Sequence, residues 1–453
     1  MDLDVGNRYS PLMTEMTEST KIQTDNVGCQ HDPRSSNKRG GRVLLLILLS
    51  VVAIALSVFL HKALPAAFVW VWLIWAIAFF GAAFVLKTEW PRAILFNLAV
   101  LAVCLAGAEL YFSHIEIKPP SYSHGYRVSD DLLGFSPAKG IQAHSKRMIG
   151  NDVLYDVTYT IDHDGLRISP PWKTDGSAGS LLFFGCSFTF GEGLQDNETF
   201  PYQVGYQSDG EYRTFNFAFH GYGPNQMLSM IEHGMVQRIV DRTTPRYAFY
   251  VAIPDHVSRV AGRVSYDNGT PRYVLDGGGN LQPAGHFTEV NPGAPWRISA
   301  LTRRLRVSAI YRRFSNPESA YVDTDLSIFL AVVVRSKELL TDQYPGLQFQ
   351  IILWPYWDEA EIPLYEKVRD GLAKTGIPLH LVEDILPDYK TNPKKYWLSP
   401  GDRHPNALAN RLVADYVLKN TLSSSSDSKQ TFQGALSPDH DQTGMADHLP
   451  PEH

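Results

Sequence analysis

Three long apolar runs near the N-terminus constrain this chain more than any other feature. Residues 43–60, 64–86 and 93–112 are each close to the roughly 20 residues that cross about 30 Å of hydrocarbon. Charged residues fall at the breaks between the runs, except for Glu109 near the end of the third. Buried core helices are the alternative interpretation. Three such runs in succession favour three transmembrane helices within residues 43–113, and the late start of the first run disfavours a cleaved signal peptide.

Basic residues around these runs predict the orientation of the chain in the membrane. More Lys and Arg precede the first run than lie in either following loop: Arg34, Lys38, Arg39 and Arg42, against Lys62, and then Lys87 and Arg92. The positive-inside rule therefore predicts a cytoplasmic N-terminus, and three crossings place everything after Phe112 on the outer side. Glu109 then lies near the outer interface, either as a snorkelling carboxylate or as part of a proton relay.

Outside these runs, the composition excludes several classes of protein. Residues 1–42 and 421–453 are polar, lack apolar periodicity and are predicted to be disordered tails. The chain has 41 Lys and Arg against 47 Asp and Glu, a net charge of −6, which argues against a nucleic-acid-binding protein. Its three cysteines, Cys29, Cys104 and Cys186, are too few and too scattered for a disulfide scaffold or a metal cluster. No metal site or cofactor is predicted.

Residues 121–420 alternate between strand and helix patterns, which predicts one α/β domain. Strands are expected at 153–161, 180–185, 214–219, 247–253 and 347–354. Helices are expected at 199–206, 225–240, 325–344, 364–375 and 407–418. Short apolar runs between helices are typical of parallel strands buried on both faces, and ligands of such sheets bind beyond the carboxyl ends of the strands.

Three polar segments follow predicted strands or precede the last helix. The segment 185–191 places Ser187 between glycines directly after a strand, where its hydroxyl and N–H can face a bound oxyanion. Residues 216–226 add two glycines and Asn225 at the same sheet edge. Near the end of the domain, Asp402 and His404 stand two residues apart on one predicted loop, where the carboxylate can orient the imidazole. Each segment alone is a weak signal.

Together, and in this order, the three segments resemble the SGNH (GDSL-like) hydrolase superfamily in its bacterial membrane-anchored branch. The resemblance covers roughly residues 150–420 and includes 164–167 and 196–201 beside the first segment. It implies a three-layer α/β/α, flavodoxin-like domain with a parallel sheet. It also implies Ser187 as nucleophile, His404 as base and Asp402 as its orienting acid. The oxyanion hole would comprise the N–H groups of Ser187 and Gly221, with Asn225 as a further donor.

The sequence departs from the family pattern at two positions. Cys186 stands where the family usually has Asp, so a cysteine nucleophile is an alternative to Ser187. Pro254 stands where the third motif usually supplies an oxyanion Asn, which is why Asn225 is considered as its substitute. This loss also leaves open a catalytically silent domain that binds a glycan.

Candidate substrate contacts and partners come from the remaining loops. His256, Trp354 and Tyr356 follow strand ends and are candidate substrate contacts, and residues 256–322 are predicted to be an insertion near the site. The resemblance implies an esterase acting on O-acyl groups of envelope polysaccharide or another envelope ester. The alternative is an O-acyltransferase to a sugar hydroxyl, which would need a multi-span acyl-donor partner. The predicted location is the inner (plasma) membrane, multi-pass, with a periplasmic or extracytoplasmic catalytic domain.

Overall fold

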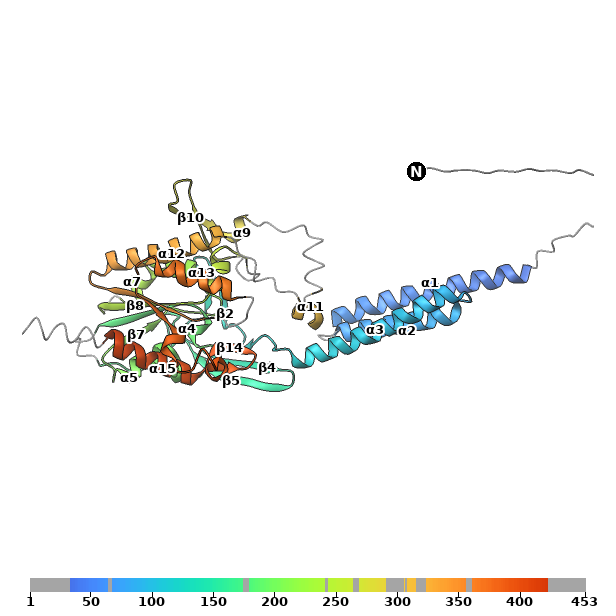
Figure 1. The fold of residues 1–453 in the computed structure, drawn as a ribbon, viewed down its shortest axis with the longest axis horizontal. Helices are drawn as coiled ribbons and strands as arrows, with labels where there is room; N and C mark the ends of the chain where they lie inside the picture. Colours follow the sequence, from blue (N-terminus) through green and yellow to red (C-terminus); the bar gives the residue numbers. More distant parts are fainter. Residues whose placement is uncertain are drawn as a thin grey trace, which may run out of the picture.

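The computed structural model shows a bundle of three long helices joined to an α/β domain (Figure 1). It describes residues 33–63, 67–173, 179–240, 243–263, 269–290, 305, 308–314, 323–355 and 361–422. Residues 1–32 and 423–453 of the two predicted tails, parts of the insertion and Tyr356 lie outside the described residues.

The N-terminal bundle consists of α1 (Pro33–Ala63), α2 (Ala67–Val85) and α3 (Glu89–Ile115). All three contain segments long and apolar enough to cross a membrane, namely Gly41–Phe59, Phe68–Val85 and Glu89–Ile115. Large apolar side chains such as Phe59, Ile77 and Phe84 are exposed on the bundle, as lipid-facing residues are. Helix α1 begins at Pro33, ten residues before the expected start of the first span at 43. The basic segment 34–42 is therefore part of this helix.

The α/β domain is built on a five-stranded parallel sheet in the order β12-β11-β8-β6-β7. Its strands are β6 (Ser180–Phe184), β7 (Arg213–Asn216), β8 (Pro245–Ala252), β11 (Gln348–Leu353) and β12 (Leu379–Leu381). Every residue of β6 is buried, because helices cover both faces of the sheet. The predicted α/β fold class is therefore confirmed, and β12 is a strand that the sequence patterns did not reveal.

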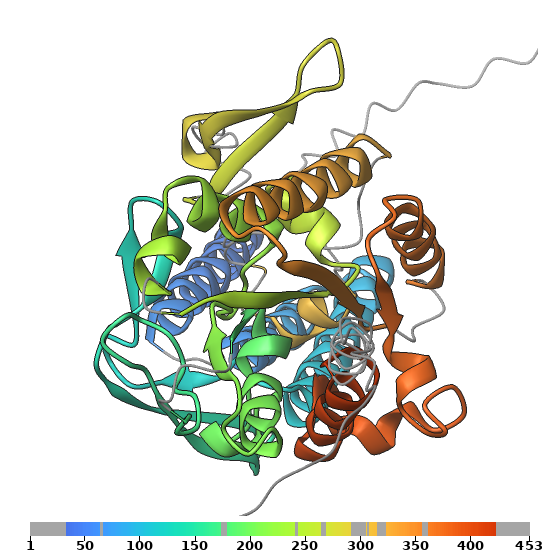
Figure 2. The ribbon, with the colours of Figure 1, turned by 90° about the vertical axis from the view of Figure 1, so that its left-hand side faces the viewer.

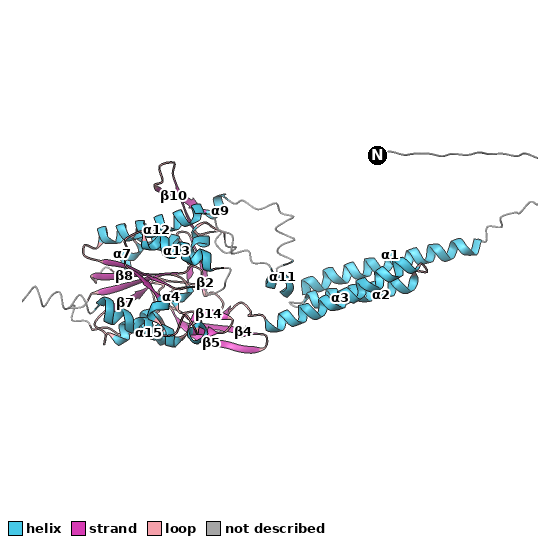
Figure 3. Cartoon of the chain, viewed as in Figure 1, coloured by secondary structure: helices cyan, strands magenta, loops and turns pink. Residues whose placement is uncertain are grey.

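Two hydrophobic clusters hold the three layers together. One face of the sheet packs against α6 (Pro224–Glu232), α12 (Asp323–Gln343) and α13 (Ile362–Ala373). The other face packs against α5 (Phe200–Gln207) and α15 (Ala407–Val417). Figures 2 and 3 show the strands enclosed between these two layers of helices. The expected helix 225–240 is instead split into α6 and α7 (Met235–Ile239), because Gly234 adopts a φ of 67° between them.

The segment that follows α3 forms antiparallel strands outside the five-stranded sheet. The hairpin of β4 (Gln142–Ile149) and β5 (Asp152–Thr160) pairs with β1 (Ser121–Tyr122), and β2 (Arg127–Asp130) pairs with β3 (Gly134–Pro137). Within the insertion, β9 (Pro271–Leu275) and β10 (Leu281–His286) form a hairpin around 276–280. The remaining short elements are α4 (Ser187–Phe190), η1 (Asp196–Glu198), α8 (His256–Val260), α9 (Phe287–Val290), α11 (Ala309–Phe314), α14 (Val382–Ile385), η2 (Pro393–Tyr396), β13 (Trp397–Ser399), β14 (Asp402–Pro405) and η3 (Leu418–Leu422).

Candidate active site

Ser187 lies at the carboxyl end of β6, as the first residue of the short helix α4. The turn that places it there needs glycine at 185, because Gly185 has a φ of 152° and a Cβ would lie 2.2 Å from the Thr189 hydroxyl. The Ser187 side chain is nearly buried, at 6% exposure. Its backbone N–H opens a helix, where first-turn N–H groups have no partner within the helix.

A hairpin of β13 and β14 brings the histidine and aspartate to this serine across more than 200 residues of sequence. His404 Nε2 lies 2.8 Å from Ser187 Oγ, and His404 Nδ1 lies 2.6 Å from Asp402 Oδ1. Asn406 then caps α15 by accepting a hydrogen bond from the Ala409 N–H at 3.0 Å. The segment 402–405 is thus a strand between two anchored elements rather than the expected loop, and the three predicted side chains form one continuous hydrogen-bond chain.

Two charged residues that the sequence analysis did not single out complete this chain. Arg147 on β4 places Nη1 2.8 Å from Asp402 Oδ2 and 3.5 Å from Glu192 Oε1. Glu192 Oε2 lies 3.7 Å from His404 Nε2, the nitrogen that faces Ser187. Glu192 follows Gly191 in the first segment, so its position near the serine was open to prediction. Arg147 lies 255 residues from Asp402 and carried no local signal.

The buried charges shift the pKa values of the site in opposite directions. Burial acts to lower the pKa of His404, but the negative charges of Glu192 and Asp402 outweigh it and raise that pKa. Burial acts to raise the pKa of Glu192, but His404, His220 and Arg147 hold it well below its usual range. The pKa of Asp402 is lowered as well, since His404 and Arg147 outweigh its burial. The site therefore holds two ionised carboxylates around one imidazole of raised basicity.

The loop with Gly221 is tied to the loop with Ser187 through His220. His220 Nδ1 lies 2.9 Å from Glu192 Oε2, and its Nε2 lies 2.8 Å from the Tyr126 hydroxyl. Burial lowers the pKa of His220 despite the adjacent Glu192 carboxylate, so the ring is held neutral. Gly221 itself has a φ of 75°, in the region that favours glycine. Buried hydrogen bonds thus fix the approach of this loop to the sheet edge.

Two of the predicted side chains are occupied elsewhere in the fold. Asn225 is buried in α6, where its Nδ2 donates a hydrogen bond of 2.9 Å to the Pro271 carbonyl on β9. This contact joins α6 to the insertion and occupies the Asn225 amide nitrogen, while its expected oxyanion role stays a prediction. His256 is fully buried, with Nδ1 2.6 Å from the Tyr250 hydroxyl. His256 thus lies inside the domain, and its expected contact with substrate stays a prediction.

The remaining candidates lie behind the site or beyond the described residues. Trp354 is buried and packs edge-to-face on Phe188 at 5.8 Å, and Phe188 lies 5.1 Å from the His404 ring. Trp354 therefore packs against Phe188, one ring removed from the imidazole, and its expected sugar contact stays a prediction. Cys186 is fully buried in the hydrophobic cluster on the α5 and α15 face of the sheet, which leaves Ser187 as the nucleophile candidate. Among the residues described, no group of three or more His, Cys, Asp or Glu side chains could hold a metal ion.

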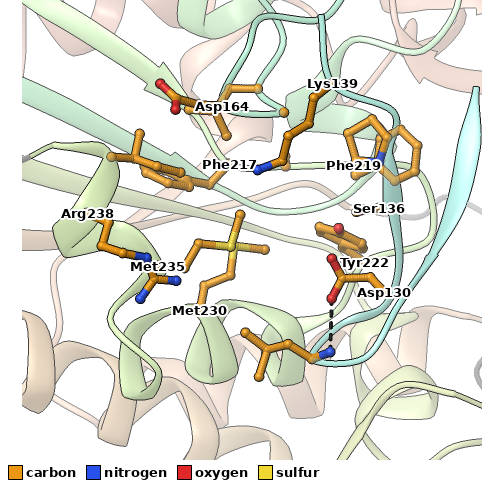
Figure 4. Close-up of a pocket in the computed structure, with 16 residues that line it drawn as sticks. Asp130, Ser136, Lys139, Asp164, Phe217, Phe219, Tyr222, Met230, Met235 and Arg238 are labelled. Atoms are coloured by element: carbon orange, nitrogen blue, oxygen red, sulfur yellow. Dashed lines mark hydrogen bonds between the residues drawn. The ribbon is translucent and has the colours of Figure 1, made fainter.

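A cavity of about 480 Å³ lies beside the β2–β3 hairpin, apart from the triad. Phe217, Met230 and Met235 form an apolar part of its lining, and the charged side chains of Lys139 and Arg238 also line it (Figure 4). None of its lining residues belongs to the Ser187, His404 and Asp402 set. The cavity is therefore a separate feature of the domain.

Comparison with known proteins gives remote structural likeness only. No family model and no curated protein matches the chain. Similar solved structures include a lipolytic G-D-S-L family protein from Veillonella parvula, with 13% identity and a TM-score of 0.30 over 54% of this chain and 98% of that one. A putative arylesterase from Agrobacterium tumefaciens has 12% identity and a TM-score of 0.31 over 55% and 99%. A carbohydrate esterase family 2 enzyme with a carbohydrate-binding domain, from Corynascus thermopiles, has 12% identity and a TM-score of 0.29 over 60% and 72%.

Proposed function

We propose that this chain is a membrane-anchored serine esterase of the SGNH type that acts on O-acyl groups of envelope polysaccharide. The observation that carries the proposal is the hydrogen-bond chain from Ser187 Oγ through His404 to Asp402, with distances of 2.8 and 2.6 Å. A nucleophile within hydrogen-bond reach of a base, which a third group orients, is the arrangement that acyl transfer requires.

The proposed reaction passes through an ester of Ser187. Its Oγ attacks the carbonyl carbon while the hydroxyl proton moves to His404 Nε2, and the carbonyl electron pair becomes an oxyanion. The N–H groups of Ser187 and Gly221 stabilise that oxyanion, and loss of one such donor typically costs about 10²–10³ in rate. The bond to the alcohol then breaks, and His404 returns the proton to the alcohol. Water repeats the sequence, which releases the carboxylic acid and restores Ser187.

Glu192 and Arg147 have positioning roles in this proposal. Glu192 faces His404 Nε2 at 3.7 Å, so its charge favours the imidazolium that forms when Ser187 gives up its proton. Through His220, the same carboxylate also holds the loop that carries Gly221. Arg147 balances the two carboxylates and keeps Asp402 directed at His404. The partly exposed guanidinium thus offsets the charge of two buried carboxylates at the centre of the site.

A fluorophosphonate probe and an aryl acetate test the proposal on the folded, full-length protein. We expect covalent labelling at Ser187 and steady hydrolysis, both lost in Ser187→Ala and the hydrolysis lost in His404→Ala. Ser129→Ala, at an exposed serine of β2, is the matched control and should behave as the parent protein. Labelling that persists in Ser187→Ala would falsify the proposed nucleophile. Absence of turnover in a folded parent protein would favour the silent, glycan-binding alternative.

The acceptor of the acyl group distinguishes the esterase from an O-acyltransferase. The same three residues serve both reactions, since a sugar hydroxyl can replace water in the second half of the cycle. The acyl-Ser187 enzyme is incubated in isotopically labelled water with a glycan that has free hydroxyl groups, and both products are measured. Labelled oxygen in the released acid indicates hydrolysis, whereas an acylated acceptor sugar without that label indicates transfer and a need for an acyl-donor partner.

We also propose that the N-terminus is cytoplasmic and that the α/β domain lies on the outer side of the plasma membrane. The excess of basic residues before the first span supports this orientation. A fusion of alkaline phosphatase to the C-terminus should be active. An inactive fusion, together with an active cytoplasmic reporter at the same point, would reverse the assignment.

A further inference from the structure

The triad lies close to the end of the third membrane helix. Helix α3 is 27 residues long, or about 40 Å, whereas the hydrocarbon core is about 30 Å thick. A span that begins after Arg92 leaves the hydrocarbon near Phe112. The exposed Tyr111 and the Phe112 ring, which meets Phe314 at 5.6 Å, lie at this level. Aromatic side chains are enriched at such interfaces, so this end of α3 marks the membrane surface.

The chain that follows α3 joins the active-site side of the α/β domain within three residues. Ile117 pairs with Ile149, and the Lys118 N–H donates to the Met148 carbonyl at 2.9 Å. Arg147 Nε donates to the Lys118 carbonyl at 3.1 Å, and its Nη1 donates to Asp402 at 2.8 Å. One arginine side chain therefore separates the end of the membrane helix from the catalytic carboxylate.

A second contact joins the same helix to a short helix of the insertion. Glu109 on α3 is buried and accepts hydrogen bonds from the Ser308 hydroxyl at 2.8 Å and the Ala309 N–H at 2.6 Å. These groups begin α11, so the carboxylate caps that helix and binds part of the 256–322 insertion to the membrane bundle. Figure 1 shows α11 beside the end of the bundle and β14 near the point where α3 enters the domain. This contact and the bridge between Ile117 and Ile149 both lie at the end of α3 that meets the domain.

The path from the membrane surface to the triad is correspondingly short. From Phe112 to Lys118 there are three helical and three extended steps, at most about 15 Å. The lipid headgroups extend the bilayer by roughly 5–8 Å on each side of the hydrocarbon. Lys118 is therefore held within about 15 Å of the hydrocarbon edge, and Asp402 lies one arginine side chain farther, just beyond the headgroup layer.

We infer that the site acts on an ester carried by a molecule embedded in the bilayer, a lipid-linked substrate whose scissile carbonyl lies near the headgroup level. This inference rests on the proposed esterase function and narrows its substrate class. The acylated glycan would be processed while it is still attached to its lipid. The membrane helices then anchor the domain and also set the distance between the active site and the bilayer.

A ladder of lipid-anchored esters measures this height directly. The full-length protein is reconstituted in phosphatidylcholine vesicles with two-chain lipids that carry a fluorogenic acetyl ester on spacers of increasing length. A soluble aryl acetate is assayed in the same samples. We expect the fastest lipid-ester turnover with short spacers and a decline as the spacer lengthens. A rate that instead rises with spacer length toward that of the soluble ester would place the site away from the bilayer and overturn the inference.

The Glu109 attachment provides the test by mutation. Glu109→Ala removes the cap of α11 without touching the triad, and we expect short-spacer turnover to fall by about tenfold, equivalent to roughly 1.4 kcal/mol in the barrier. Aryl acetate turnover should stay within about twofold. Glu89→Ala, an exposed carboxylate at the other end of α3, is the matched control and should change neither rate. Equal losses of both activities in Glu109→Ala would mean that Glu109 stabilises the fold rather than the height, against the inference. If the parent protein does not hydrolyse the aryl acetate at all, the result would instead count against the proposed esterase function.

Discussion

Two arginines serve the two sides of this site in different ways. Arg167 is 1% exposed and supports the nucleophile side, donating to the carbonyls of Phe190, Gly191 and Leu194 at 2.6–2.8 Å and to Asp196 at 2.9 Å. Arg147 is partly exposed and supports the acid–base side, where its guanidinium meets the carboxylates of Asp402 and Glu192. Arg167 binds mostly backbone carbonyls and fixes the conformation of the loop after Ser187. Arg147 binds titratable groups next to His404 and sets the charge around the base.

This difference separates stability from catalysis. A guanidinium that satisfies buried carbonyls cannot be removed without leaving those carbonyls unpaired in the interior. A guanidinium between two carboxylates changes the protonation of its neighbours when it is removed. Substitutions on the two sides should therefore give different patterns in unfolding experiments and in pH profiles.

The largest effect is expected for Arg167→Met. It leaves the carbonyls after α4 and the Asp196 carboxylate without their donor, so we expect a loss of roughly 3–5 kcal/mol in the free energy of unfolding. Hydrolysis should be lost as well, because the loop that positions Ser187 is no longer held. Chemical denaturation of the detergent-solubilised protein measures the change. Arg411→Met, at an exposed arginine of α15, is the matched control and should cost less than about 0.5 kcal/mol. Equal stabilities of the two variants would contradict the structural role of Arg167.

Arg147→Met should affect the reaction more than the fold. Loss of its charge removes a cause that lowers the pKa of His404, so that pKa should rise further. Since the base must be neutral to accept the Ser187 proton, the acidic limb of the pH profile of kcat/KM should move to higher pH. We expect a fall of about 10²-fold at neutral pH, as for loss of an orienting group of general acid–base catalysis. A fall in rate with an unmoved acidic limb would make Arg147 a structural residue like Arg167.

Glu192→Gln should move the same limb in the opposite direction. The Glu192 charge is the foremost cause that raises the pKa of His404, and the neutral amide removes it while nearly keeping the shape. The pKa of His404 should fall, and the acidic limb of kcat/KM should move to lower pH. We expect about a tenfold loss at the pH optimum, or roughly 1.4 kcal/mol in the barrier, because the imidazolium is less well stabilised. Shifts of the acidic limb in opposite directions in Glu192→Gln and Arg147→Met would support an electrostatic role for both residues. Shifts in the same direction would refute that role.

The sequence predicted the frame of the site better than its surroundings. The order of Ser187, Gly221 and the Asp402–His404 pair was visible because each segment follows a strand or precedes a helix, and local patterns reveal such positions. Arg147 was missed because its partner Asp402 lies 255 residues away and its strand pairs only in the folded chain. Asn225 and His256 were assigned to the site because they lie near strand ends. The contacts of Asn225 with β9 and of His256 with Tyr250 could not be read from those positions. A loop position indicates which edge of the sheet a residue reaches, while the direction of its side chain depends on tertiary packing.

The smallest effect is expected for Tyr155→Phe, which separates the two carboxylates of the acid–base side. The Tyr155 hydroxyl donates to Glu192 Oε1 at 3.4 Å, a long and weak hydrogen bond. Its loss leaves Glu192 paired with His220 and Arg147, so the carboxylate should stay ionised and the acidic limb should not move. We expect kcat/KM to change by less than about threefold, within the roughly 0.5–1.5 kcal/mol of a typical hydrogen bond. A pH profile and an unfolding curve measured beside Glu192→Gln check this. Tyr155→Phe could instead shift the acidic limb of the pH profile as far as Glu192→Gln does. The ionised state of Glu192 would then depend on the Tyr155 hydroxyl and not on Arg147.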